Sequence, residues 1–137
     1  MSADPAPRHQ SRERALTLLY EAELKGESPF EVLDALAVAP DPYVTTLLSA
    51  VTDRADEIDA LVDDAAIGWD LARMAVVDRN VLRLATAELL AGDDVPTAVI
   101  LNEAVELASA YSTDDSGRFV NGVLAAVART VRGATPD

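Results

Sequence analysis

The sequence predicts an all-α protein, a compact single-domain helical bundle, and three observations support this fold class. Apolar residues recur at spacings of three and four along most of the chain, which is the period of an amphipathic helix. No segment shows the sustained alternation of apolar and polar residues that marks a strand. The 137 residues are 50% hydrophobic but only 4% aromatic, which suffices for the core of one domain and disfavours an aromatic-rich β-sandwich.

The first half of the chain is predicted to form three helices. The first spans residues 8–24. The second starts at a capping box, in which the Ser28 hydroxyl accepts from a backbone amide and Glu31 reaches back, and it runs to about residue 37. The third follows another cap-and-proline pair. Its apolar stripe predicts one long helix over residues 42–67, with acidic residues on the solvated face.

The second half is predicted to form three further helices after a short turn that begins at Asp70. They span residues 78–91, residues 97–111, and a last segment from the capping cluster at 112–116 to about residue 131. Three polar side chains of the first of these helices are expected to face outward: Arg79, Arg83 and Thr86.

Three residues do not fit this pattern simply. Glu88 falls inside the apolar sector of its helix, so it either receives a cation or amide from a partner, or pairs internally with an arginine such as Arg73 or Arg83. Trp69, the only Trp, stands at a helix junction and is expected to be a buried packing wedge. Gly122 lies mid-helix at a cost of about 1 kcal/mol, which the close approach of a helix or ligand would explain.

The domain is expected to cover residues 8–132, between flexible tails at residues 1–7 and 133–137. The N-terminus has no apolar run of signal-peptide length, and no stretch approaches the roughly 18 apolar residues of a membrane span. We therefore expect a cytoplasmic protein that binds no membrane.

The charges are segregated along the chain. The net charge is −13, but residues 1–25 are neutral overall, residues 26–115 carry −15, and residues 116–137 carry +2. The acidic middle disfavours a polyanionic partner, whereas the arginines of the two ends would form one basic patch if the ends meet in space. The alternative is that these arginines are solvated surface.

The sequence offers little for catalysis. It has no cysteine and a single histidine, His9, which excludes a thiolate nucleophile and most zinc sites. The glycine motifs of phosphate and dinucleotide binding are absent. Glu103 and Glu106 are three residues apart, but on a polar helix face and without the Glu-x-x-His motifs of carboxylate-bundle metal sites. We predict a binding module rather than an enzyme, with no metal and no cofactor.

Several motifs, in a fixed order, resemble the NusB family of transcription antitermination factors over residues 8–124. Residues 102–108 read Asn-Glu-Ala-Val-Glu-Leu-Ala, and residues 119–124 read Phe-Val-Asn-Gly-Val-Leu. Further matching positions include Arg8, Arg12, Tyr20, Trp69, Met74, Asp78, Arg79, Arg83, Glu88 and Ser116.

The resemblance implies an all-α fold of about seven helices and no catalysis. It also implies a role: binding the boxA element of nascent RNA together with NusE, a ribosomal protein that doubles as a transcription factor. In the family, this complex is part of the RNA polymerase antitermination complex. It helps the elongating polymerase to pass terminators, notably in ribosomal RNA operons.

Carried over by position, the resemblance implies roles for eight residues. Five are expected to contact RNA: Arg8, Arg12, Arg14, Arg118 and Phe119. Three are expected near the NusE surface: Asp78, Arg83 and Glu88. Phe119 lies at the edge of the apolar sector, so it is either a stacking platform for a base or a core residue.

Two departures from the family pattern remove phosphate contacts. Residues 9–11 interrupt what is often a run of arginines, and Ser109 replaces a common lysine. We therefore expect weak RNA binding by this chain alone, with NusE supplying the remaining contacts. The alternative function is a protein-only helical adaptor or a homodimer, with the acidic middle as its interaction face.

Overall fold

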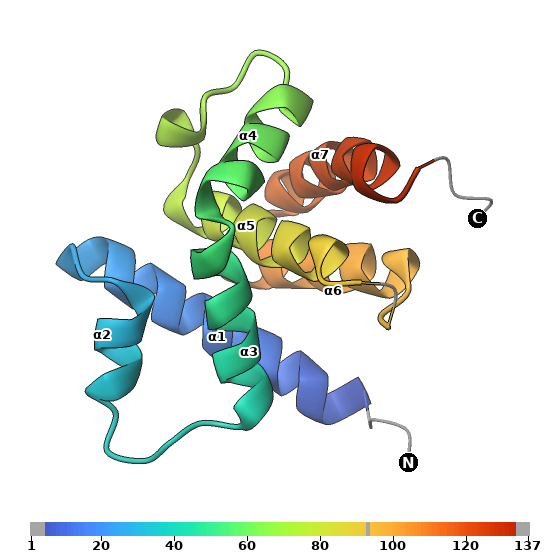
Figure 1. Cartoon of the computed structure of the whole chain (residues 1–137). Coiled ribbons are helices and arrows are strands. Elements are labelled where there is room, and N and C mark those ends of the chain that lie inside the picture. The colour runs from blue at the N-terminus through green and yellow to red at the C-terminus, as the bar shows by residue number, and fades with distance from the viewer. Residues whose placement is uncertain (1–4, 93, 134–137) are drawn as a thin grey trace.

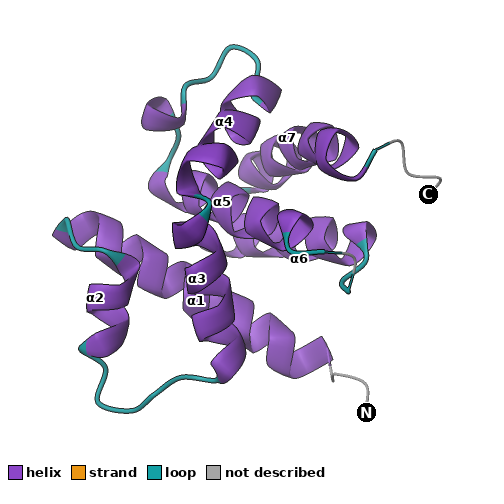
Figure 2. Cartoon of the chain, in the orientation of Figure 1, coloured by secondary structure: helices purple, strands orange, loops and turns teal. Residues whose placement is uncertain are grey.

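The structure, a computed structural model, describes residues 5–92 and 94–133. These residues form seven α-helices and one short 3₁₀ helix, without a strand, so the predicted fold class is confirmed (Figures 1 and 2). Residues 1–4 and 134–137, which include most of the predicted tails, lie outside the described part. The elements are α1 (Pro5–Lys25), α2 (Pro29–Asp34), α3 (Pro42–Asp53), α4 (Ala55–Ala65), η1 (Leu71–Arg73), α5 (Val76–Leu90), α6 (Thr97–Tyr111) and α7 (Asp114–Arg132).

Helix α5 lies at the centre of the bundle, in contact with α1, α3, α4, α6 and α7 (Figure 1). Thr86 is fully buried, and the side chains of Arg79 and Arg83 are only 13% and 25% exposed. The prediction that these three residues face outward was therefore wrong. A helix that is covered on several sides has no solvated stripe, so amphipathic spacing does not describe it.

The predicted long helix over residues 42–67 is two helices. Helix α3 ends at Asp53 and α4 begins at Ala55, with Arg54 between them at φ −123° and ψ 30°. The break allows α3 to pack on α1 while α4 packs on α7, and both contact α5. The apolar spacing continues through the break, so periodicity alone did not reveal it.

The other helix limits differ little from the prediction. Helix α1 begins at Pro5, and α2 ends at Asp34, a few residues before the expected end. The capping box of α2 is present, with the Ser28 hydroxyl accepting from the Glu31 amide and the Glu31 carboxylate accepting from the Ser28 amide. None of the described helices is long and apolar enough to cross a membrane.

The close approach between α6 and α7 occurs at Gly117. A Cβ at this position would collide with the side chain of Ser109 on α6. At Gly122, the glycine that the sequence singled out, a Cβ would meet no described atom within 4 Å. Gly122 is therefore an exposed glycine, and Gly117 allows the two helices to pack.

Candidate nucleic-acid and partner interface

A buried ion pair ties the first half of α1 to the C-terminal end of α5. Arg12 Nε and Nη2 donate to the two carboxylate oxygens of Glu88 at 2.8 and 2.9 Å, and each side chain is only 4% exposed. The internal alternative for Glu88 thus describes the structure, although its partner is Arg12 rather than Arg73 or Arg83. In this arrangement neither side chain is open to a phosphate or to another protein.

Tyr43 of α3 completes this buried network. Its hydroxyl donates to Glu88 Oε2 at 2.7 Å. Burial of the ring, followed by the hydrogen bond to Glu88, raises the pKa of Tyr43 to about 12, so the hydroxyl remains a donor at neutral pH. No sequence signal singled out Tyr43, because its role depends on α3 crossing beside α5.

Arg8 and Arg14 are the accessible N-terminal arginines. Arg8 is partly exposed, and its Cζ atom lies 4.7 Å from the centre of the Tyr43 ring, within the range of a cation–π contact. Tyr43 therefore holds one face of this guanidinium. Arg14 is exposed. Of the three N-terminal arginines expected to contact RNA, Arg12 alone is buried.

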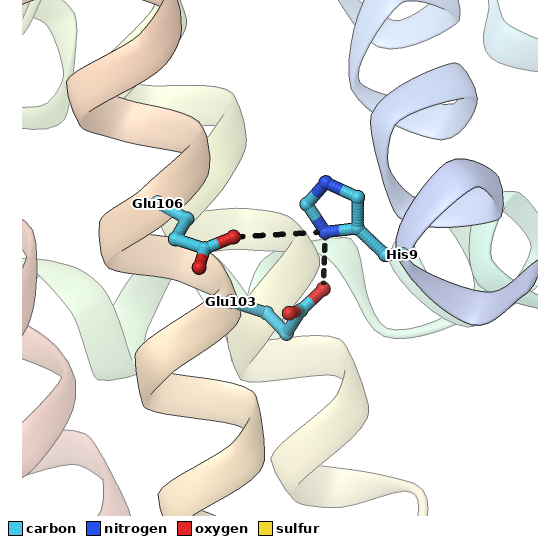
Figure 3. A group of neighbouring side chains, drawn as sticks. All are labelled: His9, Glu103 and Glu106. Atoms are coloured by element: carbon cyan, nitrogen blue, oxygen red, sulfur yellow. Dashed lines mark hydrogen bonds and ion pairs between the residues drawn. The ribbon is translucent and has the colours of Figure 1, made fainter. Parts of the chain in front are cut away.

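His9 lies between α1 and α6, beside two carboxylates (Figure 3). Its Nδ1 atom is 2.7 Å from Glu103 Oε1 and 3.9 Å from Glu106 Oε1. The hydrogen bond to Glu103 raises the pKa of His9 above 6.5, with smaller contributions from the charges of both glutamates and of Glu13. The arrangement pairs a histidine with two carboxylates at the surface of the bundle.

The N-terminal end of α5 contributes to a pocket of about 320 Å³ between η1 and the start of α7. Trp69 is 55% exposed and packs edge-on against Phe119, with ring centres 5.8 Å apart. The prediction that Trp69 is a buried wedge was therefore wrong: the ring forms part of the pocket wall. Phe119 is partly buried and packs against the core, which agrees with the core alternative, and its role as a stacking platform stays a prediction.

Asp78 belongs to the lining of the same pocket and is 9% exposed. The Ser116 hydroxyl donates to Asp78 Oδ2 at 3.2 Å, whereas Oδ1 has no hydrogen-bond partner among the described residues. Burial raises the pKa of Asp78, and the bond from Ser116 offsets part of this rise. Arg118 is exposed nearby on α7 and is paired with Asp115.

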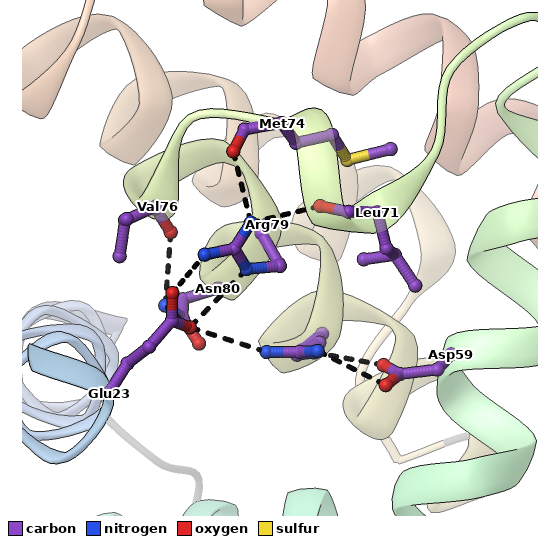
Figure 4. Close-up of polar contacts among 8 residues, drawn as sticks. Glu23, Asp59, Leu71, Met74, Val76, Arg79 and Asn80 are labelled. Atoms are coloured by element: carbon purple, nitrogen blue, oxygen red, sulfur yellow. Dashed lines mark hydrogen bonds and ion pairs between the residues drawn. The ribbon is translucent and has the colours of Figure 1, made fainter. Parts of the chain in front are cut away.

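Arg83 belongs to a half-exposed network between α1, α4 and α5 (Figure 4). Its Nε and Nη2 donate to Asp59 at 2.8 and 3.1 Å, and its Nη1 lies 3.5 Å from Glu23 Oε1. Glu23 also accepts from Arg79, whose Nη1 donates to two backbone carbonyls at the end of η1. Burial by itself would raise the pKa of Glu23, but the hydrogen bond and charge of Arg79 hold it below its usual value.

Two of the arginines expected to contact RNA, Arg8 and Arg118, lie at opposite ends of α5. Arg8 lies near Glu88 at one end of α5, whereas Arg118 lies near Asp78 at the other. Asp78 and Glu88 are ten positions apart, which corresponds to about 15 Å of helix. Arg132, which reaches the first of these ends, donates to Leu89 O, Val95 O and Thr97 Oγ1 and thereby caps α5.

Comparison with known proteins decides the family. The sequence model of the NusB family matches residues 9–129. The chain belongs to the NusB family. It is 49% identical over 142 aligned positions to the Transcription antitermination protein NusB of Saccharopolyspora erythraea, covering 94% of this chain and 96% of that protein. The family consists of antitermination factors rather than enzymes. The predicted NusB family and the prediction that the protein is not an enzyme are therefore confirmed.

Solved NusB structures share the fold. T. maritima NusB is 32% identical with a TM-score of 0.82, and the match covers 94% of this chain and 93% of that one. A chain from a crystal structure of the antitermination factors NusB and NusE in complex with dsRNA is 28% identical with a TM-score of 0.78, covering 91% and 98% respectively. This chain thus shares the seven-helix NusB fold, and that fold positions the residues at both ends of α5.

Proposed function

We propose that this NusB-family protein binds boxA RNA of nascent transcripts, notably of ribosomal RNA operons, together with NusE. In this role it keeps RNA polymerase elongating within the antitermination complex, and it acts in the cytoplasm as a single RNA-binding domain over residues 8–132. The likeness to the NusB–NusE–dsRNA complex carries the proposal, because it spans nearly the whole chain at a TM-score of 0.78.

The RNA-contacting residues that we propose are the accessible members of the expected set. Arg8 and Arg14 of α1, and Arg118 of α7, carry the positive charges that position phosphates. Phe119, which makes a T-shaped ring contact with Trp69, offers an aromatic surface in the pocket wall. In this proposal Arg12 does not itself contact RNA. Its bond to Glu88 fixes helix α1, which carries Arg8.

The NusE contact that we propose centres on Asp78 and Arg83. Asp78 Oδ1 is an acceptor in a pocket and lacks a partner among the described residues, so a donor from another protein would satisfy it. Arg83 is partly exposed beside Glu23 and Asp59. The proposed contact does not include Glu88, because its buried carboxylate is engaged by Arg12 and Tyr43 at the other end of α5.

The decisive experiment is a titration of labelled boxA-like RNA and of a scrambled RNA with this protein, with and without the cognate NusE, at two salt concentrations. We expect weak binding by the chain alone and tighter, boxA-selective binding with NusE. Arg8→Ala should reduce the salt slope by about 0.7, the value for one phosphate contact to single-stranded nucleic acid. Lys25→Ala, at the other end of α1, is the matched control and should leave the slope unchanged.

Equal binding to both RNAs in the presence of NusE would contradict the proposal and indicate a protein-only adaptor. The oligomeric state, measured by light scattering on the same samples, distinguishes a homodimer from a monomer that joins NusE.

A further inference from the structure

We propose that His9, Glu103 and Glu106 form a binding site for a divalent transition-metal ion, with Zn²⁺ as its best-matched occupant. The three ligands are not among the residues proposed to contact RNA or NusE, and the site was not predicted from the sequence, because the three residues come together only when α1 packs beside α6. Figure 3 shows the histidine ring facing both carboxylates across the gap between these helices.

The distances suit a metal ion with small adjustments. One ligand atom from each residue lies within 4.8 Å of the other two. In a tetrahedral site, metal–nitrogen and metal–oxygen bonds of about 2.0–2.2 Å place neighbouring ligand atoms about 3.3 to 3.6 Å apart. The distance of 2.7 Å from Nδ1 to Glu103 Oε1 must therefore open by about 0.6 to 0.9 Å, and that of 3.9 Å to Glu106 Oε1 must close by about 0.3 to 0.6 Å.

The ligand set favours a borderline metal over a hard one. One imidazole nitrogen and two carboxylate oxygens suit Zn²⁺, Co²⁺ or Ni²⁺, whereas Mg²⁺ and Ca²⁺ prefer oxygen ligands only. The two glutamates are three residues apart on α6, so they project from one face of a rigid helix. Glu106 is 68% exposed and the site adjoins an open hollow of about 470 Å³, so water can complete the coordination.

The charges around the site favour a dication on balance. The carboxylates of Glu103 and Glu106 face His9, and Glu13 lines the adjoining hollow, so the site is surrounded by negative charge. The opposing charge is Arg12, whose Nη1 lies 3.3 Å from Glu103 Oε1. Arg12, however, donates two hydrogen bonds to the carboxylate of Glu88, so its positive charge is largely compensated. In the absence of metal, the His9 and Glu103 atoms that would bind the ion form a hydrogen bond with each other.

The test is isothermal titration of the full, tag-free chain with ZnCl₂ at about 0.15 M salt, which screens non-specific attraction to the acidic surface. We expect one Zn²⁺ per chain, and no displacement of it by equimolar Mg²⁺. His9→Ala and Glu106→Gln should each weaken binding by at least about tenfold, the scale on which even outer-shell changes act. Glu27→Gln, which removes one exposed carboxylate elsewhere, should leave the affinity unchanged.

Spectroscopy identifies the ligands independently of stability. Co²⁺ should give visible d–d absorption bands that His9→Ala loses, and in the wild type it should broaden the ring resonances of the single histidine, His9. Circular dichroism shows whether each variant is folded, and the exposed Glu106 tests the site even if another variant unfolds. Binding that is absent in the wild type, or equal in the wild type and His9→Ala, would overturn the proposal.

Discussion

Helix α1 crosses α5 through two polar networks that differ in burial. Near the start of α1, Arg12 pairs with Glu88, and both side chains are 4% exposed. Near its end, Glu23 pairs with Arg79 and Arg83, with exposures between 13% and 28%. The two networks have opposite polarity. The arginine belongs to α1 in the first network, whereas the arginines belong to α5 in the second.

This difference teaches that the same chemical pair has different consequences at the two ends of the crossing. A fully buried pair that loses one partner leaves a charge without water or a counter-ion, which costs several kcal/mol. A half-exposed pair that loses one partner is rescued by water and by its remaining neighbours. The N-terminal network should therefore govern stability, and the second network should mainly adjust it.

The largest expected effect is that of Arg12→Met. The substitution leaves the Glu88 carboxylate buried with only the Tyr43 hydroxyl as a donor, so we expect a loss of about 3–5 kcal/mol in the free energy of unfolding. Urea denaturation followed by circular dichroism measures it. The double variant Arg12→Met with Glu88→Leu should recover much of this loss, because it removes both charges.

Arg118→Met is the matched control for Arg12→Met. It makes the same change of side chain, but in an exposed pair with Asp115. The free energy of unfolding should therefore change by less than about 0.5 kcal/mol. Equal losses in the two variants would contradict the assignment of the Arg12–Glu88 pair as the buried one.

Tyr43→Phe should have the next largest effect. It removes the hydroxyl that donates to Glu88 while retaining the ring against Arg8, so we expect a loss of about 1.5–2 kcal/mol. The same denaturation experiment measures it. RNA affinity at low salt should change little, since the ring is kept. A strong loss of RNA binding would show that the hydroxyl, rather than the ring face, positions Arg8.

Glu23→Gln tests the half-exposed network. Arg83 keeps Asp59, and Arg79 keeps its bonds to the carbonyls of Leu71 and Met74. We therefore expect a loss of only about 1 kcal/mol in the free energy of unfolding. A loss as large as that of Arg12→Met would erase the difference between the two networks.

The smallest expected effect is the pH dependence from His9, at the edge of the buried network. Its folded pKa is raised above 6.5, mainly by the bond to Glu103, so its contribution to stability is fully present below pH 6.5 and is lost as the pH rises through the folded pKa. Melting temperatures between about pH 5 and 9 measure this loss. In His9→Gln that part of the pH profile should become flatter, and an unchanged profile would exclude the ion pair in solution.

Local sequence determined most of the helix limits, although it did not reveal the break between α3 and α4. Apolar spacing and capping residues predicted the limits of α6 at residues 97–111, the cap of α2 at Ser28, and the turn that begins at Asp70. These features depend on residues three or four positions apart, and such residues are neighbours in any helix. The ordered motifs near the C-terminus indicated the family for the same reason: they can be read along the chain.

Only the tertiary structure decided which charges meet. The sequence marked Glu88 as a misfit in its apolar sector, but its partner stands 76 residues away and is chosen by the crossing of α1 over α5. This crossing buries Arg12, while the packing of α1 against α3 and α6 places Arg8 over the Tyr43 ring and brings His9 to Glu103. Spacing fixes which face of a helix a side chain occupies, whereas its burial and its partner depend on the helices that cover that face.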